Sequence, residues 1–330
     1  MAPALPRPGY GPSSRYVPRA ATTRTRAPAR IPLAALASRL TPRDQWLVHM
    51  VHEHRVLTTG QIHRLAFSAR RRAQRRLLIL HRLGLLDSFR PLTTYGSSPE
   101  HYTLGPAGAA LLAAYADSTP KTLGWRPTHT ARIAFSPSLG HDLGTNDLLV
   151  GLAAHRRTHE AGLTLWLSER SCTRRWGDLV RPDAYAHWSD GDQVLPFFLE
   201  YDTGSQNLAR VEAKLDAYAH ATTTTRARPA LLLHTRTAAR EHTLRQRLTG
   251  TARQYELLLA TASADLTADT PWGPWWLPAH PPALRLTLTE LAAHWLDLSP
   301  APDLERIGIG TPLDLPVPPL PPATTTGSRT

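Results

Sequence analysis

Hydrophobic residues recur every three or four positions in three short stretches near the start of the chain, and each stretch predicts a helix. The first runs from Thr41 to about His54 and opens with a threonine, a proline and an acid, an order typical of helix starts. The second follows the capping box Thr58-Thr59-Gly60-Gln61. The third runs from Ala69 to Leu83, with Ser68 as its cap and Gly84 as its end.

A β-hairpin is predicted directly after these helices. Residues 85–90 read as a strand, Gly96-Ser97-Ser98-Pro99 as a turn, and residues 101–104 as the returning strand. An apolar helix over 107–115 closes this part, and its face could pair with a second copy or cover the rest of the chain. Three helices followed by a hairpin predict a winged helix-turn-helix domain over residues 39–118.

The hydrophobic pattern changes after a linker predicted over residues 119–137. A helix over 141–159 is followed by strands at 163–168, 181–188 and 194–202. A helix at 205–221, a strand at 230–234, a helix at 238–254 and a strand at 257–262 complete the pattern. The order α-β-β-β-α-β, with an α-β extension, predicts a mixed sheet flanked by helices over residues 138–298, so the chain is of the α+β or α/β class.

Both ends of the chain have compositions that disfavour a packed core. Residues 1–38 mix proline, alanine, threonine and arginine, and residues 299–330 are rich in proline and threonine. We expect a disordered basic arm and a disordered tail. The single cysteine, Cys172, excludes a disulfide framework, and no apolar run is long enough to span a membrane. These features predict a cytoplasmic protein.

Positive charge is concentrated in the first quarter of the chain. Residues 1–90 contain 17 arginines against three acids, whereas the whole chain carries a net charge of +12. Arginine has the planar donor group that matches phosphate and the edge of guanine. This polarisation predicts a basic DNA-binding module joined to a nearly neutral domain.

Most of the candidate DNA contacts lie on the third predicted helix. At about 100° per residue, Arg71, Arg75 and Arg82 fall within roughly 40° of one another, opposite an apolar face. That helix would enter the major groove of double-stranded DNA, and the hairpin would supply a further contact. A solvated basic face is the alternative interpretation. The candidate DNA-binding residues are Arg70, Arg71, Arg72, Arg75, Arg76, Arg82 and Arg90.

Three acids in the second domain form a candidate metal site. Asp183 follows a proline on the second strand, and Glu200 and Asp202 share one face of the third strand because side chains alternate along a strand. Asp183, Glu200 and Asp202 would hold Mg²⁺ or Mn²⁺, which needs only one or two protein carboxylates beside water. A carboxylate group used only for structure is the alternative.

The order of elements and the acids resemble the restriction-endonuclease-like, PD-(D/E)XK-type nucleases. The pattern differs at one place, because Asp202 stands where the nucleases have a lysine. Lys214 on the following helix could lean toward the acids and replace it, so Asp183, Glu200, Asp202 and Lys214 are the candidate catalytic residues. His141, Asn146 and Asp147 are further candidates, with helix capping and solvation as the alternative.

Taken together, the motifs resemble the replication-relaxation family of actinobacterial and firmicute plasmids and mobile elements. The matching segments are Leu40-Thr41-Pro42-Arg43-Asp44, Tyr102-Thr103-Leu104-Gly105, His141-Asp142-Leu143, Arg181-Pro182-Asp183, Phe198-Leu199-Glu200-Tyr201-Asp202 and Lys214-Leu215 with Tyr218. The resemblance implies a role in plasmid replication, mobilisation or DNA relaxation, with plasmid DNA and a second copy of the chain as the expected partners. It leaves open whether the chain nicks DNA or is a non-catalytic initiator, accessory factor or regulator.

Overall fold

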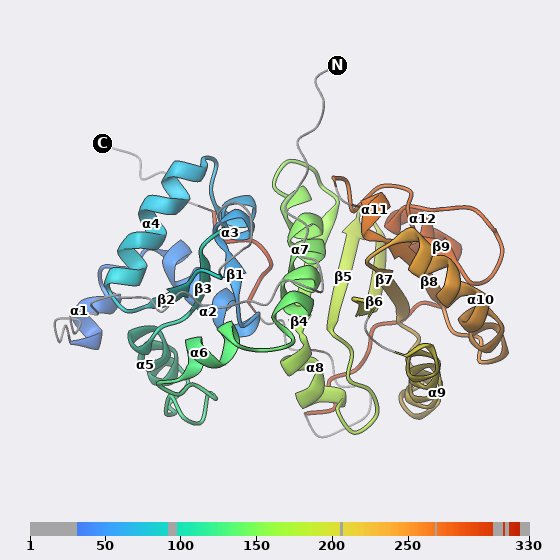
Figure 1. The fold of residues 1–330 in the computed structure, drawn as a ribbon, viewed down its shortest axis with the longest axis horizontal. Coiled ribbons are helices and arrows are strands. Elements are labelled where there is room, and N and C mark those ends of the chain that lie inside the picture. Colours follow the sequence, from blue (N-terminus) through green and yellow to red (C-terminus); the bar gives the residue numbers. More distant parts are fainter. Residues whose placement is uncertain are drawn as a thin grey trace, which may run out of the picture.

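The computed structural model describes residues 32–91, 98–204, 207–267, 269–305, 313 and 317–323. Its elements form two parts that lie side by side, with helix α7 between them (Figure 1). Within the described residues there are 12 helices, an antiparallel three-stranded sheet and a mixed six-stranded sheet. The prediction of an α+β chain with a mixed sheet is therefore confirmed.

The N-terminal part contains three consecutive helices at the positions the sequence predicts: α2 (Pro42–Glu53), α3 (Thr59–Ala66) and α4 (Arg70–Arg82). Capping boxes at Thr41 and Thr58 start the first two. Ser68, however, is not the cap of α4, because its N-cap residue is Ala69, whose side chain makes no capping hydrogen bond.

A three-stranded sheet follows these helices in the order β1 (Leu57–Thr58), β3 (His101–Leu104) and β2 (Leu86–Phe89). The predicted hairpin is the antiparallel pair β2 and β3, in which Leu86 lies opposite Leu104. The tip of the hairpin, residues 92–97, lies outside the described residues. Helix α5 (Pro106–Tyr115) buries Ala109, Leu111 and Leu112 in the core of its own chain, whereas Tyr115 is exposed.

Two segments expected to lie outside the folded domains contain helices. Helix α1 (Leu33–Ala37) lies at the end of the predicted 1–38 arm and buries Leu36, while residues 1–31 are not described. Helix α6 (His129–Ala134) lies within the predicted 119–137 linker and buries Ile133. The arginine-rich composition of the arm and the short length of the linker gave no sign that either segment would bury apolar residues.

The second part is built on a six-stranded sheet in the order β4-β5-β6-β7-β8-β9. Strands β4 (Gly162–Ser168), β5 (Ala184–Asp190) and β6 (Gln193–Asp202) run antiparallel. Strands β7 (Ala230–Thr235) and β8 (Leu259–Ser263) run parallel to β6, and β9 (Leu277–Pro278) is antiparallel at the edge.

Helices cover both faces of this sheet. Helices α7 (Leu139–His155) and α12 (Leu288–His294) contact β6 from one side. Helices α9 (Leu208–Thr225) and α10 (Ala238–Gln254) pack in the cluster on the other face. Three short helices of this part were not predicted: α8 (Glu169–Trp176) after β4, α11 (Ala264–Thr267) after β8, and α12.

The two faces of the sheet belong to separate hydrophobic clusters, and this separation places the candidate acids. Phe197 and Leu199 of β6 lie in the cluster that also contains the cores of α2, α3 and α4, whereas Phe198 lies in the cluster with α9. Side chains alternate along a strand, so Glu200 lies on the same side as Phe198, which is the α9 side.

Some of the residues in the predicted 299–330 tail are also packed: Ala301 and Asp303 are buried.

Candidate functional site

The exposed surface of α4 is the first candidate site. Ala73, Leu77 and Leu80 are fully buried, as the sequence predicts, so the opposite side of the helix faces solvent. Arg71, Arg75 and Arg82 are exposed there, and Arg70 is exposed at the first residue of the helix. None of the four makes a hydrogen bond or ion pair with a described residue. Arg72 is also exposed and lies 3.5 Å from the Oγ of Ser68. These five guanidinium groups, which we call the arginine face, are available to an external anion.

Arg76 does not belong to the arginine face. Its guanidinium forms an ion pair with Asp44 of α2, in which Nε donates to Oδ1 at 2.8 Å and Nη2 donates to Oδ2. Asp44 is 1 % exposed and also accepts hydrogen bonds from the backbone N–H and hydroxyl of Thr41. Burial raises the pKa of Asp44, but the hydrogen bonds from Arg76 and Thr41 outweigh it and lower the pKa overall. Arg76 is thus an internal tie between α4 and α2.

Arg90 lies at the end of β2, next to the undescribed hairpin tip. Its guanidinium donates to Oε2 of Glu100 from Nη2 at 2.9 Å and from Nε at 3.1 Å. Roughly half of the arginine side chain stays exposed. A pair this exposed contributes little to stability, so a phosphate could replace the carboxylate at small cost.

The second candidate site is centred on Glu200 of β6. Glu200 is 5 % exposed, and its carboxylate accepts hydrogen bonds from Nζ of Lys214 and from the hydroxyl of Tyr218, the latter at 2.5 Å. Burial raises the pKa of Glu200, and the nearby carboxylate of Asp183 raises it further. Burial lowers the pKa of Lys214, but the attraction of Glu200 outweighs it and the pKa is raised overall.

The structure therefore brings Lys214 to Glu200, and Tyr218 joins them. From the sequence, Tyr218 has no role beyond its place in the segments that match the family. The four-residue spacing between Lys214 and Tyr218 could have indicated that both side chains reach Glu200, because residues four apart lie on the same side of a helix. The two side chains reach the same carboxylate from successive turns.

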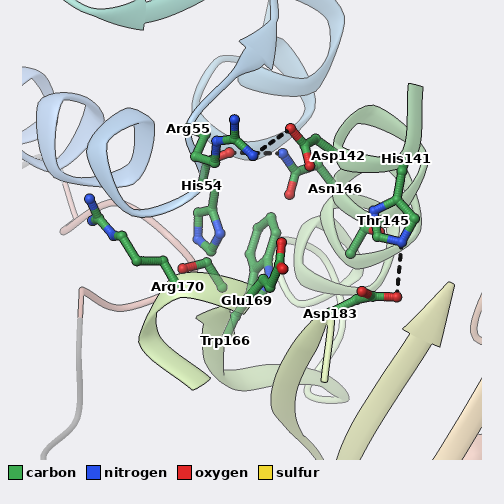
Figure 2. Close-up of a pocket in the computed structure, with 11 residues that line it drawn as sticks. His54, Arg55, His141, Asp142, Thr145, Asn146, Trp166, Glu169, Arg170 and Asp183 are labelled. Carbon is green, nitrogen blue, oxygen red and sulfur yellow. Dashed lines mark hydrogen bonds and ion pairs between the residues drawn. The ribbon is translucent and has the colours of Figure 1, made fainter. Parts of the chain in front are cut away.

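Asp183 immediately precedes β5 and connects this group to α7. Its Oδ2 accepts a hydrogen bond from the backbone N–H of Tyr201 at 2.7 Å and lies 3.0 Å from Nε2 of His141. Burial lowers the pKa of His141, but the contact with Asp183 outweighs it and raises the pKa. In the close-up, His141 and Asp183 point toward one another across the gap between α7 and β5 (Figure 2).

Asp202 has different partners from Asp183 and Glu200. Its carboxylate is held by Arg240 of α10, whose Nε donates to Oδ2 at 2.6 Å, and by the backbone N–H of Gly204 at 3.0 Å. It shares the α9 side of β6 with Glu200, as expected, but its charge is already compensated. Within the described part of the chain, no three His, Cys, Asp or Glu side chains are placed to hold one metal ion.

A small cavity of about 30 Å³ lies where the two parts of the chain meet. His54 and Arg55 line it from the end of α2, while Asp142, Trp166 and Glu169 line it from the second part (Figure 2). Arg55 forms an ion pair with Asp142 at 3.1 Å. Burial raises the pKa of Asp142 and of Glu169, and the neighbouring acids add to both effects.

The remaining candidates on α7 hold the two parts together. The Nδ2 of Asn146 donates to the carbonyl oxygens of His54 at 3.2 Å and Val56 at 2.9 Å. Asp147 forms an ion pair with Arg64 of α3. Among the described residues neither side chain makes a hydrogen bond or ion pair with Glu200, Lys214 or Asp183, and the contacts that they do make join the two parts of the chain. A further tie comes from Arg157, whose Nη1 donates to the carbonyl of Arg64 at 2.6 Å at the end of α3.

The arrangement is that of an α+β protein with an exposed arginine face on one helix and, in its second part, a buried glutamate of the sheet that pairs with a lysine of helix α9. The model of the replication-relaxation family matches residues 48–236. The chain therefore belongs to the replication-relaxation family, as the motifs indicated. No curated protein and no solved structure matches the chain. No helix in the described residues is long and apolar enough to cross a bilayer.

Proposed function

We propose that this chain binds double-stranded DNA through the arginine face of α4 and acts in the replication or mobilisation of a plasmid or other mobile element. The arginine face carries the proposal: five exposed arginines lie on one helix, and Arg70, Arg71, Arg75 and Arg82 have no described hydrogen-bond or ion-pair partner. Membership of the replication-relaxation family supports the role in replication.

The order of elements around α4 supports a winged helix-turn-helix assignment. Helices α2, α3 and α4 are followed by the antiparallel pair β2 and β3, and β1 adds a third strand. In such domains the third helix enters the major groove and the hairpin contacts the DNA backbone. Arg90, at the end of β2, would then lie on the hairpin side of the same DNA.

Binding to a labelled 30-base-pair duplex, measured by fluorescence anisotropy over a salt series, tests the proposal. If the five arginines of the arginine face each neutralise a phosphate, log affinity should fall with log salt at a slope of about −4.5. Arg71→Ala/Arg75→Ala should lower the affinity and reduce the slope by about 2.

The control variant Arg174→Ala/Arg247→Ala removes the same charge from two arginines of the second part, each paired with a glutamate there. It should leave both affinity and slope close to those of the wild type. Equal effects from the two double variants would attribute binding to net charge and refute the assignment to α4. Light scattering of the complex counts the chains bound to each duplex.

DNA cleavage is a second candidate function, favoured by the contact between Lys214 and Glu200 with Asp183 nearby. The carboxylates do not surround a common metal position, since Asp202 is bound by Arg240, so we derive no metal-dependent step. Incubation of supercoiled plasmid with Mg²⁺ or Mn²⁺ tests this function. Open circles that disappear with Glu200→Gln would support cleavage, whereas an intact plasmid that is still shifted on a gel would support binding alone.

A further inference from the structure

The proline-rich segment 317–323 lies against helix α2. The indole Nε1 of Trp46 donates a hydrogen bond to the carbonyl oxygen of Pro318 at 2.7 Å. Pro319 is buried, and Val317 and Leu320 pack against the hydrophobic cluster that contains Trp46. Trp46 itself is 4 % exposed. Residues near the end of the chain therefore cover a tryptophan near its beginning.

The contact between the Trp46 indole and the carbonyl of Pro318 is of the kind by which proteins bind proline-rich peptides. A proline-rich segment is preorganised, has no hydrogen bonds within its own backbone, and leaves its carbonyl oxygens free. Proline offers no backbone donor, so a binding surface must supply the donor, and an indole N–H beside an apolar surface does so. Aromatic surfaces that bind proline-rich peptides combine these two features.

A second tryptophan repeats the contact on the other part of the chain. The Nε1 of Trp176 in α8 donates to the carbonyl oxygen of Pro302 at 2.6 Å. Around it, the N–H of Ala301 donates to the hydroxyl of Tyr185, and Arg175 forms an ion pair with Asp303 at 3.3 Å. The C-terminal segment is thus fastened to α8 near residue 302 and to α2 near residue 318.

We propose that the surface of α2 around Trp46 is a binding site for proline-rich peptide, and that residues 317–323 of the same chain are its resident ligand. The segment acts as a strap from the six-stranded-sheet part to the helices that carry the arginine face. Because the ligand is tethered, it meets the site at an effective concentration of about 1 mM, so a weak intrinsic affinity suffices to keep it bound. The inference does not depend on DNA binding.

A labelled peptide with the sequence of residues 317–323, Val-Pro-Pro-Leu-Pro-Pro-Ala, tests the site in the full chain. Val317→Asp/Leu320→Asp should release the strap and vacate the site, because it places two charges against the apolar cluster. For an intrinsic dissociation constant of about 0.1 mM, the peptide should bind this variant about tenfold more tightly than the wild type, whose site is occupied. A peptide carrying the same two aspartates is the control and should bind neither protein.

The role of the indole is tested in the released variant. Adding Trp46→Phe keeps an aromatic ring but removes the donor, and should weaken peptide binding about fivefold, as expected for one lost neutral hydrogen bond. Adding Trp176→Phe instead removes the matching donor at Pro302 and should leave peptide binding unchanged. The proposal is overturned if the labelled peptide binds the released variant no better than the aspartate-containing peptide does.

A measurement on the unaltered chain keeps the proposal testable if the released variant does not fold. The Trp46 indole proton, identified by its loss in Trp46→Phe, should exchange with solvent much more slowly than an exposed indole, at every protein concentration. Exchange at the rate of an exposed indole would overturn the proposal. Protection that disappears on dilution, together with a doubled mass at high concentration, would assign the ligand to a second copy and overturn the intramolecular contact.

Discussion

Replacing Arg76 by alanine separates the internal arginine of α4 from the arginines that face solvent. The substitution removes both hydrogen bonds from the guanidinium to Asp44 and leaves a carboxylate that is 1 % exposed. Among the described residues, only the backbone N–H and hydroxyl of Thr41 then remain as donors to that carboxylate. Arg75, one position earlier, has no described partner to lose, which makes Arg75→Ala the matched control.

The magnitude follows from the burial of the pair. A hydrogen bond to a charged group contributes about 1.5–3 kcal/mol, and breaking a fully buried ion pair costs about 3–5 kcal/mol. The Arg76 side chain is 28 % exposed and Thr41 still binds Asp44, so the lower range applies. We expect Arg76→Ala to lower the free energy of unfolding by about 2 kcal/mol, or the melting temperature by about 4 °C. Arg75→Ala should change it by less than about 0.5 kcal/mol.

The pH dependence of the difference has a defined sign. Because the pKa of Asp44 is lower in the folded chain, its ionisation stabilises the fold above its unfolded pKa. That contribution is lost as the pH falls through the folded pKa, so wild type and Arg76→Ala should converge in acid. Thermal melts at several pH values measure stability, and anisotropy with duplex DNA measures binding. Equal stability of Arg76→Ala and Arg75→Ala at neutral pH would refute the internal role of Arg76.

Two further predictions concern buried titratable groups. Burial lowers the pKa of His54 and His101 to about 4 and of His234 to about 3, so these histidines bind protons in the unfolded chain before they do so in the folded chain as the pH falls below about 6.5. At pH 5.5 each of the three should lower the free energy of unfolding by about 1.4 kcal/mol. Between pH 7.5 and 5.5, urea unfolding should therefore show a loss of stability in His234→Gln that is smaller than the loss in the wild type by about that amount. A pH-independent difference between the two proteins would contradict this. Lys214→Met should lower the free energy of unfolding because it leaves the buried carboxylate of Glu200 without its cation. Lys214→Met/Glu200→Gln should regain part of that stability, since the double variant has no unpaired carboxylate at position 200. Additive effects of the two substitutions in a double-mutant cycle would disprove the coupling between Lys214 and Glu200.

The sequence predicted the local structure well where side chains near one another in the chain determine it. The capping boxes at Thr41 and Thr58 fixed the starts of α2 and α3. Helical periodicity identified the buried side of α4, and strand alternation placed Glu200 and Asp202 on one face of β6. Helix α8 was missed because it has only eight residues, several of them charged, and its buried side chains gain their environment from β4 and β5.

Contacts between distant residues account for the other differences. A helical projection groups Arg76 with the exposed arginines, and nothing in the local sequence shows that Asp44 lies across from it. Likewise, Asp202 and Glu200 are equivalent by alternation, but Arg240 arrives from a helix 38 residues later and pairs with only one of them. The covered Trp46 depends on a segment 272 residues further along the chain. Such pairings depend on the tertiary fold, which periodicity and composition do not encode.

The same distant contacts change the relation between the basic module and the second part. Charge polarisation suggested two domains joined by a linker, but one hydrophobic cluster contains residues of α2, α3 and α4 together with residues of β5, β6 and β7. Buried hydrogen bonds from Asn146 to the end of α2 and from Gln61 to α7 cross the boundary, and an isolated module would leave those groups without partners. Since α4 is held to α2 through Arg76, and α2 to α7 through Asn146, the arginine face has a fixed orientation relative to the six-stranded sheet. Any duplex bound by α4 would therefore meet the second part of the chain in one defined orientation, rather than at the end of a flexible tether.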